Sequence, residues 1–96
     1  MADTEIDVVD EPTKHRYEAR SQDGDELGFS AYLIRGDTVV FTHTEVDPET
    51  EGQGVGSQLV RGALDDVRRQ GRRVVAQCPF VRKYIEEHDE YADLIA

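Results

Sequence analysis

Three glycines, Gly52, Gly54 and Gly56, alternate with other residues between Glu51 and Ser57. An alternating apolar stretch precedes them and a stretch of helical periodicity follows, which predicts a strand, a tight loop and a helix. The N–H groups of a first helical turn have no intrahelical partner and attract anions. Glycine lets a ligand approach the backbone closely. The pattern therefore predicts that a phosphate-bearing ligand binds at this turn.

Two well-known glycine-rich phosphate motifs fit these residues less well. The Lys-Ser/Thr pair of a P-loop is missing. A dinucleotide-binding fold would need an acidic ribose partner on another strand, and the chain has no second half to supply it. The remaining alternative is a glycine-rich connection that serves close packing alone.

The segments around the loop have clear periodicities. Alternation predicts strands over residues 14–20, 27–34 and 38–46, joined by polar turns into an antiparallel meander. An amphipathic pattern predicts a helix over residues 55–69, ended by Gly71. Its expected buried face is formed by Val55, Leu59, Val60, Ala63, Leu64 and Val67.

A second strand–helix pair completes the predicted fold. Residues 72–78 contain the short apolar run Val74-Val-Ala76, and a right-handed crossover would place this strand parallel to residues 38–46. Pro79 begins a second helix, whose residues Phe80, Val81, Tyr84 and Ile85 are expected to face the sheet. Residues 91–96 are expected to form a short helical turn. The fold class is α/β, an antiparallel meander followed by a β-α-β crossover and a second helix.

Length and charge restrict the organisation and the partners. The 96 residues fit one domain, which we expect to comprise an acidic flexible leader over residues 1–12 and a folded domain over residues 13–96. A formal net charge of −10 disfavours binding to nucleic acid and to anionic membranes. The surface is that of an ordinary acidic protein or of a halophilic one. The single cysteine, Cys78, and the lack of signal-peptide character favour the cytoplasm.

The segment over residues 43–94 resembles the small GCN5-related N-acetyltransferase-like proteins, the minimal acetyl-CoA-binding branch of that superfamily. The superfamily's pyrophosphate loop, Gln/Arg-x-x-Gly-x-Gly/Ala, corresponds here to Glu51-Gly-Gln-Gly54-Val-Gly56. The small branch is also matched by the strand end His43-Thr-Glu-Val46, the junction Cys78-Pro79-Phe80 and the tail Tyr84…His88-x-x-Tyr91. The resemblance implies a minimal GNAT-like fold.

The same resemblance implies that acetyl-CoA is the cofactor and that the acceptor is an unidentified amine. Backbone donors would hold the pyrophosphate at Gln53, Gly54, Val55, Gly56 and Ser57. Backbone groups near Glu45 and Val46 would pair with the pantetheine arm where the two parallel strands diverge. Glu51 stands where the family has Gln or Arg, and its carboxylate is unfavourable near a pyrophosphate. The chain has no room for the N-terminal helices that shape the acceptor site in full-length enzymes.

Three residues are candidates for catalysis. Cys78 is expected at the N-terminal cap of the second helix, where the helix dipole favours a reactive thiolate that could accept the acetyl group. Its alternative role is that of a small buried hydrophobic residue. Tyr84 could protonate the departing CoA thiolate or line the core, and His43 could be a general base or an ordinary strand histidine. His15 and His88 show no ligand spacing with Cys78, so we predict no metal site.

Two functions therefore remain open. The first is an acetyl-CoA-dependent N-acetyltransferase, in which Cys78 would carry the acetyl group. The alternative is a non-catalytic CoA-binding or interaction module in which the cysteine is only packed. The cysteine–proline junction favours the enzyme, and the missing acceptor elements favour the module.

Overall fold

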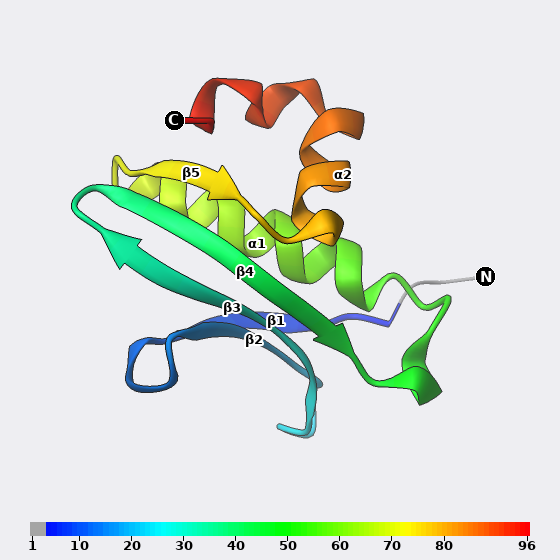
Figure 1. The fold of residues 1–96 in the computed structure, drawn as a ribbon. Helices are drawn as coiled ribbons and strands as arrows, with labels where there is room; N and C mark the ends of the chain where they lie inside the picture. Colours follow the sequence, from blue (N-terminus) through cyan, green and yellow to red (C-terminus); the bar gives the residue numbers. More distant parts are fainter. Residues whose placement is uncertain (1–3) are drawn as a thin grey trace.

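The structure is a computed structural model that describes residues 4–96. Within these residues one sheet of five strands has the order β1-β2-β3-β4-β5, so strands that follow one another in the chain are also neighbours in space (Figure 1). The strands are β1 Asp7–Glu11, β2 Arg16–Arg20, β3 Glu26–Arg35, β4 Thr38–Val46 and β5 Arg73–Ala76. The helices are α1 Val55–Arg69 and α2 Pro79–Glu87, with short 3-10 helices at Pro12–Lys14, Pro48–Thr50 and Asp89–Leu94.

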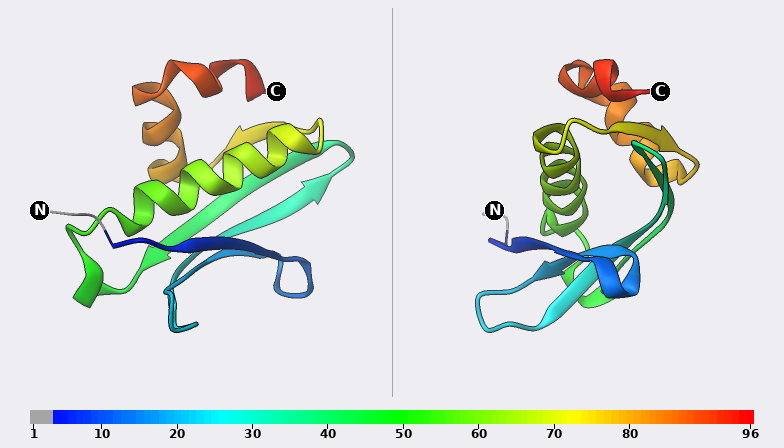
Figure 2. Two further views of the ribbon diagram at one scale, coloured as in Figure 1. Left: turned by 180° about the vertical axis from the view of Figure 1, so that it is seen from behind. Right: turned by 90° about the vertical axis from the view of Figure 1, so that its left-hand side faces the viewer.

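The connection through α1 makes the sheet mixed. Strands β1 to β4 pair antiparallel, whereas β4 and β5 pair parallel, from Thr38 opposite Arg73 to Phe41 opposite Ala76. Helix α1 lies across one face of the sheet (Figure 2). Each apolar position expected on its buried face is at most 1 % exposed. The expected α/β meander with a β-α-β crossover and second helix is therefore confirmed.

The acidic N-terminal segment is more ordered than expected. Residues 7–11 form β1, which pairs with β2 along its whole length. Val8 packs against the core, and an ideal Cβ built on Gly62 of α1 would lie 2.6 Å from Val8 Cγ2. The prediction of a flexible leader over residues 1–12 is thus wrong for 7–11, because cross-strand pairing and the half-buried Val8 offset the repulsion between acids. Residues 1–3 lie outside the described part of the chain.

A β-bulge decides which side chains of β4 face α1. The register passes from Ala31 opposite His43 directly to Tyr32 opposite Phe41, so Thr42 is the extra residue. A bulge of this kind shifts the alternation of the strand by one position. Beyond it, Thr44 joins Phe41 on the face that packs against α1. His43 and Glu45 lie on the opposite face.

Helix α2 follows β5, and its residues Val81, Tyr84 and Ile85 are buried in the core, as expected. Phe80 differs from the expectation, since it is 43 % exposed and does not face the sheet. Its ring lies instead over Gly56 of α1. At the end of the chain, the N–H of Ala96 donates to the carbonyl of Val74 at 2.9 Å and covers part of the edge of β5. In residues 4–96 we find no helix with the length and apolar character to cross a membrane.

Candidate functional site

The glycine-rich loop presents free backbone donors at the start of α1. Gly54 caps the helix with a φ of 77°, in the left-handed region that suits glycine. The first intrahelical hydrogen bond runs from the N–H of Gln58 to the carbonyl of Gly54 at 3.1 Å. Within residues 4–96, no acceptor bonds the N–H groups of Val55, Gly56 and Ser57. These three donors lie at the positive end of the helix dipole, where the sequence predicts an anion site.

Gln53 does not share this role. Its N–H donates to the carbonyl of Thr50 at 3.1 Å, and its own carbonyl accepts from the N–H of Thr4 at 2.9 Å. The side chains of Thr4 and Gln53 are also hydrogen-bonded to each other. Gln53 therefore ties the N-terminal segment to the loop, and its backbone N–H is occupied.

The individual glycines serve different purposes. An ideal Cβ on Gly56 would lie 2.6 Å from the Phe80 ring, so this glycine is required by packing between α1 and α2. A Cβ on Gly52 would meet nothing within 4 Å, but its φ of 83° is unfavourable for other residues. Packing at Gly56 and backbone conformation at Gly52 thus account for part of the glycine pattern.

A cavity of about 490 Å³ adjoins these donors, and we refer to it as the loop cavity. Val46 at the end of β4 and Phe80 of α2 form its walls opposite the loop. Its lining residues are Val46, Thr50, Glu51, Gly52, Gly54, Val55, Gly56, Ser57 and Phe80. Most of the predicted cofactor-binding residues are therefore brought together. Glu45 does not line this cavity, and its side chain is 63 % exposed beside His43 on the other face of the sheet; the expected role of its backbone groups stays a prediction.

The two parallel strands diverge beside the loop cavity. Their last pair is Phe41 opposite Ala76, after which β4 continues to Val46 without β5. The N–H groups of Gln77 and Cys78 both donate to the carbonyl of Phe41, at 3.0 and 2.9 Å. This shared acceptor turns the chain away from the sheet and places Cys78 at the N-terminal cap of α2, as predicted.

The thiol of Cys78 lies in a buried polar contact. Its side chain caps no backbone group, and the residue is 3 % exposed. The Sγ atom is 3.4 Å from Oγ1 of Thr44, which in turn lies 2.9 Å from Oγ of the fully buried Ser30. Sequence reasoning missed Thr44 and Ser30. Thr44 and Ser30 each follow a residue, His43 or Phe29, that lies on the other face of its strand. The sequence shows this spacing, but only the bulge at Thr42 reveals that Thr44 faces Cys78.

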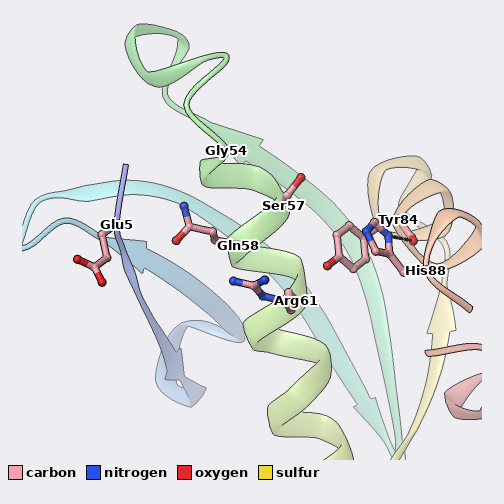
Figure 3. Close-up of a pocket in the computed structure, with 7 residues that line it drawn as sticks. All are labelled: Glu5, Gly54, Ser57, Gln58, Arg61, Tyr84 and His88. Atoms are coloured by element: carbon pink, nitrogen blue, oxygen red, sulfur yellow. Dashed lines mark hydrogen bonds between the residues drawn. The ribbon is translucent and has the colours of Figure 1, made fainter. Parts of the chain in front are cut away.

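Tyr84 and His43 make contacts that do not involve the Cys78 thiol. The Tyr84 ring stacks on His88 with a centroid distance of 3.9 Å and lines a second cavity, between α1 and α2 (Figure 3). Burial raises the pKa of Tyr84, against an opposing effect of the Arg61 charge, so its hydroxyl is protonated at neutral pH and can donate. His43 is 60 % exposed and lies 3.0 Å from a carboxylate oxygen of Glu45. Within residues 4–96, no hydrogen bond joins Cys78 to Tyr84 or His43.

Comparison with known proteins agrees with this arrangement. A profile of the GCN5-related N-acetyltransferases matches residues 16–94, most of the chain. The chain belongs to this family. A solved structure of a GCN5-like protein from Staphylococcus aureus, determined by NMR in solution, superimposes with a TM-score of 0.68 at 24 % identity. The alignment covers 100 % of this chain and 91 % of that one. A search of curated proteins found no match.

Membership of the GCN5-related N-acetyltransferases confirms the expected family and agrees with the glycine loop. Members of this family generally use acetyl-CoA as the acetyl donor. The three free N–H groups beside the loop cavity are suitable partners for a pyrophosphate, since they are hydrogen-bond donors at a helix N-terminus. Among the described residues that line that cavity, Glu51 is the one with a carboxylate. Its charge opposes the binding of an anion, as the sequence predicts.

Proposed function

We propose that this protein is an acetyl-CoA-dependent N-acetyltransferase that acts on an amine acceptor in the cytoplasm. The observation that carries the proposal is the cavity that connects the free N–H groups of Val55, Gly56 and Ser57 with Val46, where β4 runs on beyond β5. Acetyl-CoA has a phosphate-bearing end and a linear thioester arm, and a site of this kind suits both. When bound, it would supply an activated acetyl group.

We further propose that Cys78 receives the acetyl group before the amine does. The Sγ atom would attack the thioester carbonyl, so that a bond from Sγ to carbon forms while the bond from carbon to the CoA sulfur breaks. The proton of the Cys78 thiol would then neutralise the departing CoA thiolate. Thr44 would hold the thiol in position through the contact at 3.4 Å. The amine nitrogen would finally form a bond to the acetyl carbon while the bond from that carbon to Sγ breaks, and the proton lost by the amine would return to the Cys78 thiolate.

The alternative is a CoA-binding module without catalysis, and specific observations favour it as well. Cys78 is 3 % exposed, which is typical of a packing residue. Its hydrogen-bond partner is a threonine hydroxyl, which is not a general base at neutral pH. Tyr84 and His43, the other candidates for acid–base roles, make no hydrogen bond with it within residues 4–96.

The two functions can be separated by mass spectrometry of the intact protein after incubation with acetyl-CoA. Because Cys78 is the only cysteine, a gain of one acetyl group that is labile to hydroxylamine identifies a thioester on Sγ. The matched control is Cys78→Ala, which should retain its affinity for CoA in calorimetry and lose the adduct. CoA binding without an adduct, and amine acetylation that survives in Cys78→Ala, would contradict the covalent route. Absence of CoA binding would contradict the proposed function itself.

A further inference from the structure

A second cavity lies directly beside the loop cavity. Its volume is about 450 Å³, and it lies over the exposed side of α1, between the N-terminal segment and α2 (Figure 3). Its lining residues are Glu5, Gly54, Ser57, Gln58, Arg61, Tyr84 and His88. Gly54 and Ser57 line both cavities. A ligand that binds the free N–H groups at this turn can therefore extend into either space.

Arg61 is the cationic side chain of this second cavity. It follows Ser57 by four residues, so both side chains lie on the same face of α1. Other arginines of this helix are engaged with carboxylates: Arg68 lies 2.9 Å from Asp93, and Arg69 lies 3.2 Å from Asp66. Within residues 4–96, Arg61 has no ion pair. In a chain with a net charge of −10, an unpaired guanidinium at a cavity is well placed to bind an anion.

The other residues that line the second cavity suit the binding of a nucleotide. Tyr84 and His88 stack with an interplanar angle of 14° and form an aromatic wall of the cavity on the side of α2 (Figure 3). The distance along the helix from Gly54 to Arg61 is about 10 Å at 1.5 Å per residue. Glu5 also lines the cavity, and its carboxylate opposes an anion from the side of the N-terminal segment. Hydrogen bonds of Thr4 with Gln53 and Gln58 join this segment to the loop and to α1.

We infer that this cavity holds the adenosine end of CoA, with Arg61 binding the 3′-phosphate, so that the protein distinguishes CoA from nucleotides that lack this group. The inference rests on the proposed function, since it assumes that the pyrophosphate binds at the N–H groups of the loop. A guanidinium recognises a phosphate through paired N–H donors, which gives both energy and orientation. Arg61 is thus a specificity-determining residue, outside the glycine motif and remote from Cys78.

Calorimetry with CoA and with 3′-dephospho-CoA tests this inference without any measurement of activity. The proteins are the full chain, Arg61→Gln, Arg61→Lys, and Arg69→Gln as a matched control on the same helix. One ionic strength must be used throughout, because contacts between exposed charges are screened by salt. We expect the full chain to bind CoA about tenfold more tightly than 3′-dephospho-CoA, a ratio that corresponds to about 1.4 kcal/mol.

The expected results with the variants are specific. Arg61→Gln should bind both nucleotides with the affinity that the full chain has for 3′-dephospho-CoA. Arg61→Lys should retain part of the preference, and Arg69→Gln should retain all of it. Equal affinity of the full chain for the two nucleotides, or an unchanged ratio in Arg61→Gln, would overturn the inference while leaving the CoA site intact. If neither nucleotide binds, the proposed function fails and the inference fails with it.

Discussion

The thiol of Cys78 lies 3.4 Å from the hydroxyl of Thr44, and this contact joins the start of α2 to the end of β4. It depends on the bulge at Thr42, which turns Thr44 toward α1. The same hydroxyl is 2.9 Å from that of Ser30, so one threonine is the common partner of two buried groups. The contact crosses the gap where β4 and β5 separate, which is where the thioester would approach the thiol in the proposed function.

Thr44→Val tests whether this contact positions the thiol. We expect the rate at which Cys78 is acetylated by acetyl-CoA to fall, with little change in CoA affinity, because the thiol loses its orienting partner. Unfolding should also become easier by about 1–3 kcal/mol, since a buried hydroxyl at Ser30 loses its partner. Thr44→Ser keeps the hydroxyl and should restore the rate. Equal acetylation rates for the valine and serine variants would show that the contact is structural only.

Ser57→Glu tests the anion site at the start of α1. A carboxylate in the first turn of a helix is favourable by about 0.3–1 kcal/mol, so thermal stability should be kept or improved. The same charge would lie beside the pyrophosphate, so CoA affinity should fall about tenfold or more. Ser57→Ala, which preserves the backbone N–H and adds no charge, is the control and should bind normally. Undiminished affinity of the glutamate variant would place the pyrophosphate elsewhere.

Glu51→Arg should strengthen CoA binding. The residue is exposed and lines the loop cavity, where its carboxylate repels an anion. The gain should be modest, about 1 kcal/mol, because the site is screened by solvent, and it should diminish at high salt. Glu49→Arg makes the same change of charge at an exposed position that does not line the cavity. A comparable gain in both variants would indicate a general effect of net charge.

Gly62→Ala tests the docking of β1 on α1. In an exposed helix this change stabilises by about 1 kcal/mol through helix propensity. Here the new Cβ would lie 2.6 Å from Val8 Cγ2, so we expect a loss of about 1–3 kcal/mol in urea unfolding. In a Val8→Ala background the clash is relieved and the loss should shrink, which a double-mutant cycle measures. A stabilising Gly62→Ala would mean that β1 does not pack against the helix in solution.

Glu18 should make stability depend on pH in the acid range. The hydrogen bond from Arg20, assisted by that from Arg16, lowers the pKa of this carboxyl from 4.5 to about 2 in the folded protein. Because the folded pKa lies below the unfolded one, the stabilisation is fully present above pH 4.5 and is lost as the pH falls toward 2. The difference in unfolding free energy between the full chain and Glu18→Gln, on the order of 1 kcal/mol at neutral pH, should therefore vanish in acid. Glu86→Gln, on the exposed side of α2, is the control.

Local patterns in the sequence were sufficient for the strand Thr38–Val46 and the helix Val55–Arg69, which have the predicted bounds. The helix has a complete apolar periodicity, the strand is rich in β-branched residues, and a breaker follows each, so neighbouring residues alone determine them. The parallel pairing of β4 and β5 follows from the length of the connecting helix. The position of Cys78 at the cap of α2 follows in the same way from the strand before it and the proline after it.

The N-terminal strand and the bulge required the tertiary structure. Residues 7–11 carry acids at most positions, and only pairing with the arginines of β2 and packing of Val8 on Gly62 make a strand stable there. The bulge at Thr42 has no local marker, because it arises from the register between two strands. It nevertheless decides that Thr44 faces Cys78, and that His43 lies on the far side of the sheet.

The glycine motif shows most clearly which features the sequence determines and which the tertiary structure decides. Its spacing was enough to predict a helix N-terminus with free N–H groups, since these are properties of the backbone over a few residues. The spacing of the glycines could not predict the shape of the site. The cavities on either side of the loop are formed by Val46, Phe80 and Tyr84, which come from separate elements. Only folding brings these side chains together, because the contacts that enclose a cavity join residues far apart in the chain.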